Sequence, residues 1–228
     1  MVVRVEDLPE AVRRYFRRAL PSPGPLPSIV RITQTGEMQL KPGRWLPFEA
    51  TQEARVGRVE FAWRTRFALA PLIGVRVNDW FREGEGGLKG RLFRFIPVAR
   101  ATGPETARSE AMRYLAELPW FPPAILGNDD LEWRELDHNT VEVATGVGYS
   151  EAAVTLRFDK AGDIVGAFAP DRPRQEGKLF VERPWTGSFA DYRDLGGVRV
   201  PTRAEVRWEL PDGLFTYFRA RITGLDLV

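Results

Sequence analysis

Cysteine is absent from this chain of 228 residues, which excludes disulfide bonds, thiol nucleophiles and cysteine-ligated metal sites. Histidine occurs once, at His138 in the turn-like stretch "LDHNT". A Ser-His-Asp triad or a histidine-ligated metal would therefore depend on that one residue. The glycine-rich stretches "GEGG" and "GVG" lack the strand-to-helix context and the Lys-Ser/Thr pair of a phosphate-binding loop. These absences predict that the protein has no metal site and no cofactor.

Long apolar runs are missing as well. No stretch of about 18 apolar residues is present, which excludes a transmembrane helix. Residues 1–20 are charged throughout and lack the apolar segment of a signal peptide, so we expect a cytoplasmic protein. The 33 basic and 31 acidic residues nearly cancel, and nothing in this balance predicts binding to nucleic acid.

The N-terminal part, residues 1–20, has the pattern of a basic amphipathic helix. Its apolar side chains recur at helical spacing: Leu8, Val12, Phe16 and Ala19. Such a helix either packs its apolar stripe on its own domain or lies on a membrane surface. Peripheral membrane contact through residues 8–20 is therefore an open alternative. The proline-rich stretch 21–28 that follows predicts a linker.

From Ile29 onward, apolar residues recur at every second position instead of at helical spacing. In "VEFAWRTRFAL" (59–69), apolar and aromatic side chains alternate with glutamate and arginine, which indicates a half-buried strand. Short turn-like stretches rich in glycine separate similar runs and predict antiparallel neighbours. The pattern predicts a first strand set over 29–98 and a second over 131–228. Three of the predicted strands cover 88–96, 163–169 and 185–193.

About a dozen strands in series are too many for a flat open sheet, which would curl or split. The sequence therefore predicts a single β-rich domain over residues 1–228. Its class is α+β and mostly β, with a strongly curved antiparallel sheet that forms an incomplete β-barrel. We expect the helices of the central stretch 104–126 to lie on the concave face of that sheet.

The central helix carries the most distinctive polar pattern, because Glu110, Arg113, Tyr114 and Glu117 recur at i, i+3, i+4 and i+7. Seven residues of helix separate the two glutamates by roughly 10 Å, whereas glycosidase carboxylate pairs lie about 5 to 9.5 Å apart. Arg113 between them would also keep both ionised. The pattern favours a buried ion-pair network, while an enzyme that uses Glu110, Tyr114 and Glu117 stays an alternative.

Nearly the whole chain resembles an uncharacterised bacterial family whose members carry only a domain of unknown function. The matching stretches are "LPEAVRRYFRRALP", "GRWLPFEATQ", "EAMRYLAELPWFPPAIL" and "PWTGSFADYRDLGGVRVPTRAEVRWELPDG". The pattern F-x-D-Y-x(4)-G-x-x-x-P-T-x-x-E, from Phe189 to Glu205, is similar to strands of the LolA/LppX-like lipoprotein-carrier fold. That resemblance implies an incomplete barrel with helices on its concave side and an apolar cavity for acyl chains. The chain differs from those carriers because residues 1–20 do not have the pattern of an export signal.

We therefore expect a non-catalytic protein that binds a lipid or another apolar or amphipathic small molecule in a half-barrel cavity. The inward strand face should meet the central helix, and the expected ligand-binding residues are Phe61, Trp63, Phe67, Tyr114, Glu117 and Trp120. The first alternative is a structural or interaction protein whose barrel is filled by its own aromatic side chains. A continuous apolar cavity against the helix would favour binding, and a carboxylate with a raised pKa there would favour the enzyme.

Overall fold

The computed structural model describes residues 4–21, 24–70, 73–92, 96–147 and 150–228. The helical elements in these ranges are η1 (Val5–Asp7), α1 (Glu10–Ala19), α2 (Pro104–Ala116), η2 (Leu118–Trp120) and α3 (Pro122–Gly127). The strands are β1 (Ile29–Lys41), β2 (Arg44–Arg55), β3 (Phe61–Ala70), β4 (Ile73–Arg82), β5 (Glu85–Leu92), β6 (Ile96–Thr102), β7 (Glu132–Asp137), β8 (Thr140–Val147), β9 (Ser150–Phe158), β10 (Ile164–Glu176), β11 (Leu179–Leu195), β12 (Val198–Leu210) and β13 (Gly213–Leu227).

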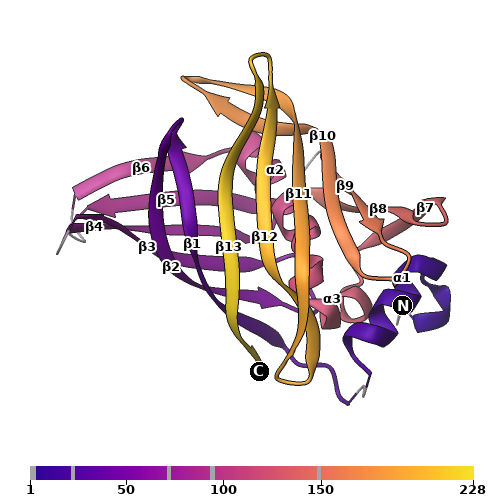
Figure 1. The fold of residues 1–228 in the computed structure, drawn as a ribbon. Helices are drawn as coiled ribbons and strands as arrows, with labels where there is room; N and C mark the ends of the chain where they lie inside the picture. The colour runs from indigo at the N-terminus through magenta and orange to yellow at the C-terminus, as the bar shows by residue number, and fades with distance from the viewer. Residues whose placement is uncertain (1–3, 22–23, 71–72, 93–95, 148–149) are drawn as a thin grey trace.

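These thirteen strands form one sheet in the order β6-β5-β4-β3-β2-β1-β13-β12-β11-β10-β9-β8-β7. Every neighbouring pair is antiparallel. Because β1 pairs with β13, the first and the last strand lie side by side in the middle of the sheet, while β6 and β7 are its edges. In Figure 1 the strands β4 to β6 run across the direction of β11 to β13. The predicted α+β class, with a strongly curved antiparallel sheet that does not close into a barrel, is confirmed.

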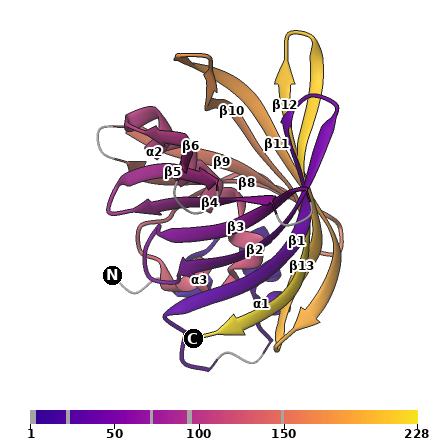
Figure 2. The same cartoon turned by 90° about the vertical axis from the view of Figure 1, so that its left-hand side faces the viewer.

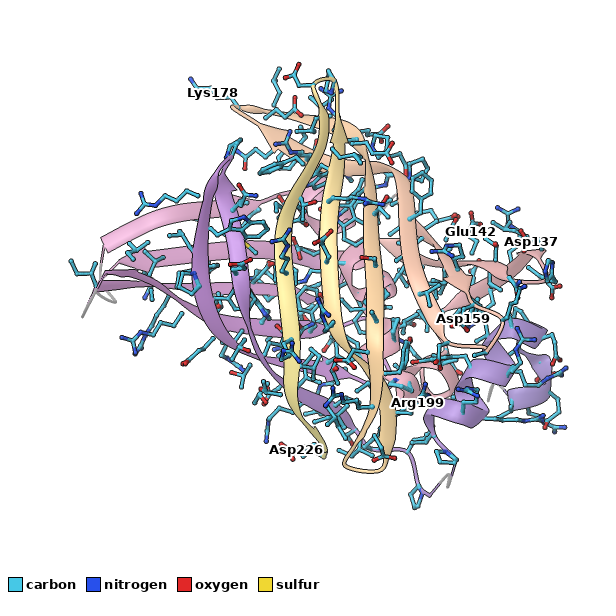
Figure 3. The ribbon with its side chains drawn as sticks, in the orientation of Figure 1. Asp137, Glu142, Asp159, Lys178, Arg199 and Asp226 are labelled. Atoms are coloured by element: carbon cyan, nitrogen blue, oxygen red, sulfur yellow. The ribbon has the colours of Figure 1, made fainter. Side chains whose placement is uncertain are left out.

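The hairpin of β10 and β11 extends further than the sequence predicted. The strand predicted over 163–169 continues to Glu176, and the strand predicted over 185–193 begins already at Leu179. Pro170 and Pro173 lie just beyond the predicted end of the first of these strands, and a proline cannot donate to a ladder. The strand accommodates them through a register shift between Ala169 and Arg172. Lys178 lies at the tip of the resulting hairpin (Figure 3).

The single strand predicted over 88–96 is also wrong, because the structure has β5 up to Leu92 and β6 from Ile96. Alternation alone did not separate these two strands, and residues 93–95 lie outside the described ranges. The first strand set therefore ends at Thr102 and not at 98. Pro97 lies in β6, an edge strand of the sheet, where a proline is tolerated because one side of the strand is unpaired.

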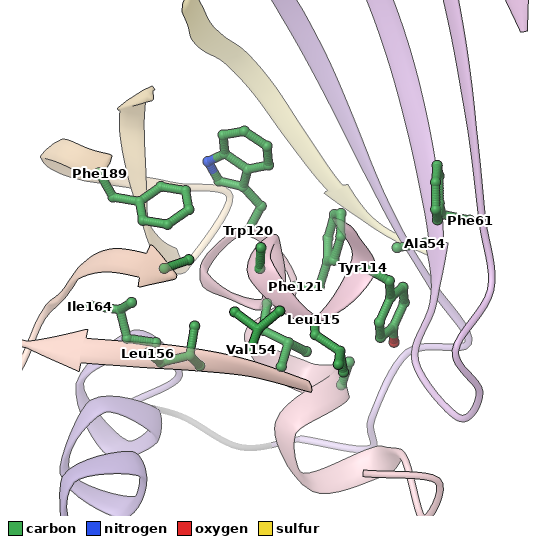
Figure 4. Close-up of a cluster of buried hydrophobic side chains, with 14 of the residues drawn as sticks. Ala54, Phe61, Tyr114, Leu115, Trp120, Phe121, Val154, Leu156, Ile164 and Phe189 are labelled. Atoms are coloured by element: carbon green, nitrogen blue, oxygen red, sulfur yellow. The ribbon is translucent and has the colours of Figure 1, made fainter. Parts of the chain in front are cut away.

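The central helices lie on the concave face of the sheet, as the sequence predicted. Figure 2 shows the sheet bending around them, and α2 contacts β4, β5 and β6 as well as β8, β9 and β10. Gly86 of β5 permits the close approach of the helix, because a Cβ there would lie 2.8 Å from Cα of Ala107. On the side of the second strand set, Leu115 and Phe121 of the central stretch lie among buried side chains that include Val154 of β9 (Figure 4).

The N-terminal helix α1 packs its apolar stripe into the core of the same protein. Val12 and Ala19 are fully buried, and the helix contacts β8, β12 and α3. Arg18 and Arg199 both pair with Asp163, at 3.6 and 2.6 Å. The apolar stripe is therefore not free to enter a membrane, and the predicted membrane contact would depend on the arginines of α1. No helix in the described ranges is long and apolar enough to span a membrane.

Candidate functional site

A cavity of about 580 Å³ lies between α2 and the concave face of the sheet. One wall comes from β3, β4 and β5, and the other from β10 to β13, so residues far apart in the sequence meet around it. Its lining is mainly apolar and aromatic, with polar groups along α2. The aromatic side chains of the lining are Trp63, Phe67, Trp120, Phe180, Trp185, Phe189, Trp208, Tyr217 and Phe218.

Other depressions of the molecule have a different character. One, of about 800 Å³, is lined by threonines and by charged side chains of the first strand set, such as Arg64, Arg66 and Lys89. A second, of about 750 Å³, is lined by Arg55, Arg58 and other charged residues near the β2–β3 turn. The cavity beside α2 combines apolar walls with a few converging polar groups, which is the usual pattern of a small-molecule site.

One polar stripe of α2 faces this cavity. The stripe consists of Thr106, Ser109, Glu110, Arg113 and Glu117, which all belong to the lining. Their spacing of three and four residues keeps them on one side of a helix that turns about 100° per residue. Other residues of α2 face the core, so the helix presents polar groups to the cavity and apolar groups to the sheet.

Arg113 is the centre of a buried ion-pair network. Its Nε donates to Oε1 of Glu117 at 2.9 Å, and its Nη1 pairs with Oδ2 of Asp79 on β4. The second oxygen of Glu117 accepts from Gln52 of β2. A buried charge is costly unless it is paired in this manner. The network therefore attaches α2 to the first strand set.

Aromatic rings complete the environment of Arg113. Its guanidinium carbon lies 4.9 Å from the ring centroid of Phe61 and 5.0 Å from that of Trp63. Such cation–π contacts contribute about 0.5 to 1 kcal/mol at exposed sites and about 2 kcal/mol or more when the cation is desolvated. The stack holds the guanidinium against β3.

Burial raises the pKa of the Glu110 carboxyl to about 8, with a further upward contribution from nearby Asp79. Burial also raises the pKa of Asp79, against the lowering effect of Arg113. Burial alone would lower the pKa of Arg113, but Glu117, Asp79 and Glu110 together hold it above its ordinary value. At neutral pH the Glu110 carboxyl is therefore mostly protonated, while Arg113 stays charged.

Arg172 of β10 lines the cavity on the side of the second strand set and is buried, with 5% of its surface exposed. Its Nε donates to Oγ of Ser109 at 3.1 Å. Its guanidinium carbon lies 4.5 Å from the ring centroid of Trp185 and 5.6 Å from that of Trp208. No carboxylate of the described residues lies within ion-pair distance of it. Arg113 and Arg172 thus each stack on aromatic rings of their own. They differ because Arg113 forms ion pairs and Arg172 forms none with the described residues.

Four of the six predicted ligand-binding residues line the cavity: Trp63, Phe67, Glu117 and Trp120. Phe61 and Tyr114 do not. Phe61 lies beneath the guanidinium of Arg113. Tyr114 is fully buried and donates its hydroxyl to the carbonyl of Arg55 at 2.8 Å.

Tyr114 lies outside the cavity because consecutive residues of a helix point in different directions. Arg113 and Tyr114 are consecutive, so their side chains leave the axis about 100° apart. Glu110, Arg113 and Glu117 face the cavity, whereas Tyr114 faces the β2–β3 end of the core and packs on Phe121 at 6.0 Å between ring centroids. The residues that the enzyme alternative needs are therefore not assembled at one site.

Sequence reasoning missed several polar residues of the lining, above all Asp79, Thr106, Ser109 and Arg172. A signal for Asp79 exists in the alternation of β4, where it occupies an inward position between Val77 and Phe81. Thr106 and Ser109 precede Glu110 and Arg113 at helical spacing, which is a weaker signal. Arg172 carried none, since it lies beyond the predicted strand 163–169, between Pro170 and Pro173.

Comparison with solved structures supports the fold through one of them. The chain is similar to a LolA superfamily protein from Nitrosomonas europaea, with 10% identity, a TM-score of 0.50 and coverage of 96% of this chain and 92% of that one. A β-barrel-like protein with a domain of unknown function (DUF1849) from Brucella abortus is 9% identical, with a TM-score of 0.24 and coverage of 89% and 98%. No curated protein matches the chain.

The similarity to the first structure confirms the resemblance to the LolA-like fold that the distal strand pattern indicated. Residues 3–220 match the model of a protein family described as "Family of unknown function (DUF6544)". This match covers nearly the whole chain, as the resemblance of the four sequence stretches did. The chain therefore belongs to this family of unknown function, DUF6544.

Proposed function

We propose that the protein binds a lipid, an acyl chain or another hydrophobic or amphipathic small molecule in the cavity beside α2, without changing it chemically. The observation that supports this function is the cavity itself, of about 580 Å³, with an aromatic lining and a polar stripe. Small-molecule sites have volumes of about 300 to 1,000 Å³ and this kind of lining. A barrel filled by its own side chains would be packed at the density of a protein interior.

The six residues expected from the sequence take different parts in this proposal. Trp63, Phe67 and Trp120 contact the apolar portion of the ligand, since they line the cavity. Glu117 keeps Arg113 in place at the edge of the same cavity. Phe61 and Tyr114 act indirectly, through the stack on Arg113 and the attachment of α2 to β2.

Native mass spectrometry of protein purified without detergent tests the proposal directly. A bound apolar molecule would appear as an added mass that is lost on denaturation and can be identified after extraction. The same preparation, stripped of ligand, is then titrated with fatty acids and phospholipids. Trp63, Trp120, Trp185 and Trp208 line the cavity, so saturable changes of tryptophan emission are expected. An unliganded mass together with unchanged emission across the lipid panel would contradict the proposal and favour the filled barrel.

A second candidate function is acid catalysis, and one observation favours it. Glu110 lines the cavity and burial raises its pKa to about 8, which suits a general acid at neutral pH. A panel of nitrophenyl esters and glycosides, assayed with wild type and Glu110→Gln, tests this function. Catalysis predicts a loss of about 100-fold or more in the variant. Rates equal to the uncatalysed background in both proteins would exclude it for these substrates.

A further inference from the structure

Arg172 is a buried cation whose charge no ion pair of the described residues neutralises. It is 5% exposed, lines the cavity and makes one side-chain hydrogen bond, through Nε to Ser109. An uncompensated buried charge is strongly destabilising, and the stacks on Trp185 and Trp208 offset only part of that cost. A guanidinium carries five N–H donors, and among the described residues only the Nε donor of Arg172 has a side-chain acceptor, so its two terminal nitrogens can donate to a further acceptor.

The acidic residues near Arg172 do not supply the missing ion-pair partner. Asp79 and Glu117 are both engaged by Arg113. Glu110 lies 4.0 Å from Nη1 of Arg113, and its carboxyl is mostly protonated at neutral pH. Asp79 and Glu117 therefore both belong to the network of Arg113, and neither forms an ion pair with Arg172.

Two buried polar atoms of α2 line the same cavity as Arg172. Oγ1 of Thr106 and Oε2 of Glu110 are buried without a hydrogen-bond partner, and both residues line the cavity with Ser109. A hydroxyl and a protonated carboxyl can each donate to an anion. The guanidinium of Arg172 and these two neutral donors of the α2 stripe thus lie along the same cavity, next to its aromatic wall.

From this arrangement we propose that Arg172 and the adjoining part of the α2 stripe bind the carboxylate head of an amphiphile, whose chain lies along the aromatic wall. The inference depends on the proposed binding function and specifies its ligand class. A carboxylate matches the planar fork of arginine and balances its single charge. A phosphate head carries a larger negative charge, which the nearby acidic residues disfavour, and an ammonium head would repel Arg172.

The experiment uses the full chain and four amphiphiles with the same twelve-carbon tail: dodecanoate, dodecyl phosphate, dodecanol and dodecylammonium. Each is titrated below its micelle concentration, with tryptophan emission as the readout. Wild type should bind dodecanoate about tenfold or more tightly than dodecanol, and dodecylammonium more weakly than either. Arg172→Met should lose the preference for dodecanoate and keep the affinity for dodecanol.

Arg183→Met is the matched control, since it removes the same charge from the residue opposite Arg172 on β11. Arg183 does not line the cavity, and its partner Glu176 keeps an ion pair with Arg174 at 2.7 Å. This variant should retain the preference for dodecanoate. If Arg172→Met does not fold, a crystal structure of wild type with dodecanoate replaces it. The carboxylate should then lie within hydrogen-bond distance of the guanidinium of Arg172.

The outcomes separate this inference from the function on which it depends. Equal affinities of wild type for dodecanoate and dodecanol, or an unchanged preference in Arg172→Met, would overturn the carboxylate subsite and leave apolar binding intact. Tighter binding of dodecyl phosphate or dodecylammonium would overturn the assigned head group. Failure of all four amphiphiles, dodecanol included, would instead contradict the proposed function. In the crystal structure, a carboxylate at any other place in the cavity would also overturn the subsite.

Discussion

Arg113 and Glu117 form an ion pair across one turn of α2, with Nε of the arginine donating to Oε1 of the glutamate at 2.9 Å. The other oxygen of Glu117 accepts from Gln52, so both oxygens are used by the protein itself. The pair is buried, with 14% and 12% of the two side chains exposed. Glu117 therefore has a structural connection to β2 in addition to its place at the cavity.

Replacing Glu117 by glutamine should lower the free energy of unfolding by about 3 kcal/mol. This magnitude is typical when a buried pair is broken from one side, and Asp79 still partly neutralises Arg113. Urea denaturation measures the change. The control is Glu53→Gln, whose carboxylate pairs with Arg31 and Arg64 at the surface and should lose less than about 1 kcal/mol. Equal losses in the two variants would show that the network beside α2 is not buried.

Tyr114→Phe should lower stability without a change in ligand affinity. The hydroxyl donates to the carbonyl of Arg55 and accepts from Nδ2 of Asn128 at 3.2 Å. Its removal leaves buried groups unpaired, at a cost of about 1 to 3 kcal/mol. Denaturation and a dodecanoate titration on the same preparation measure both quantities. Weaker binding at unchanged stability would place Tyr114 in the ligand site, contrary to its position in the structure.

Trp63→Ala should affect stability and binding together, because this side chain belongs to the core and to the cavity wall. Trp63 is 2% exposed and donates its Nε1 to Gln34 at 2.8 Å. The loss of stability should be about 3 to 5 kcal/mol, and dodecanoate should bind about tenfold more weakly. Trp133→Ala is the control, since Trp133 is half-buried on β7 and does not line the cavity. An unchanged affinity in Trp63→Ala would argue against the proposed site.

The stability of wild type should fall as the pH rises from about 4.5 to 8. Burial and Asp79 raise the pKa of Glu110 from 4.5 to about 8 in the folded protein. In this window the folded protein holds a proton that the unfolded chain has lost. Through Glu110 alone, stability therefore decreases with pH by at most about 1.4 kcal/mol per unit. Asp79, whose pKa is also raised, contributes in the same direction.

Glu110→Gln should reduce this slope, because glutamine stays neutral at every pH. The comparison is made by urea denaturation at pH 5, 6.5 and 8. Glu105→Gln, an exposed position in the first turn of α2, should keep the wild-type slope. The charged groups that face Glu110 are Asp79, Arg113, Glu117 and Arg172. If Glu110→Gln retained the full slope, the titration would belong to another of these groups.

The sequence by itself determined the class of the fold. Alternation such as that of 59–69 and the short turns between strands are local properties, and they predict antiparallel neighbours wherever they occur. The number of strands then requires curvature. The helical spacing of Glu110, Arg113 and Glu117 likewise placed these residues on one face before any tertiary contact was known. The β10–β11 hairpin shows the limit of local signals, because its prolines are accommodated by a register shift.

Only the tertiary structure decided which residues meet at the cavity. Asp79 and Arg113 are 34 positions apart in the sequence, and Ser109 and Arg172 are 63 apart. Their contacts follow from the curvature of the sheet and from the rotation of α2 against it, which no local pattern specifies. The same rotation turned Tyr114 into the core and left Arg172 without an ion pair among the described residues. Because burial of a charge depends on the whole surrounding packing, the character of the site follows from the fold and not from any single motif.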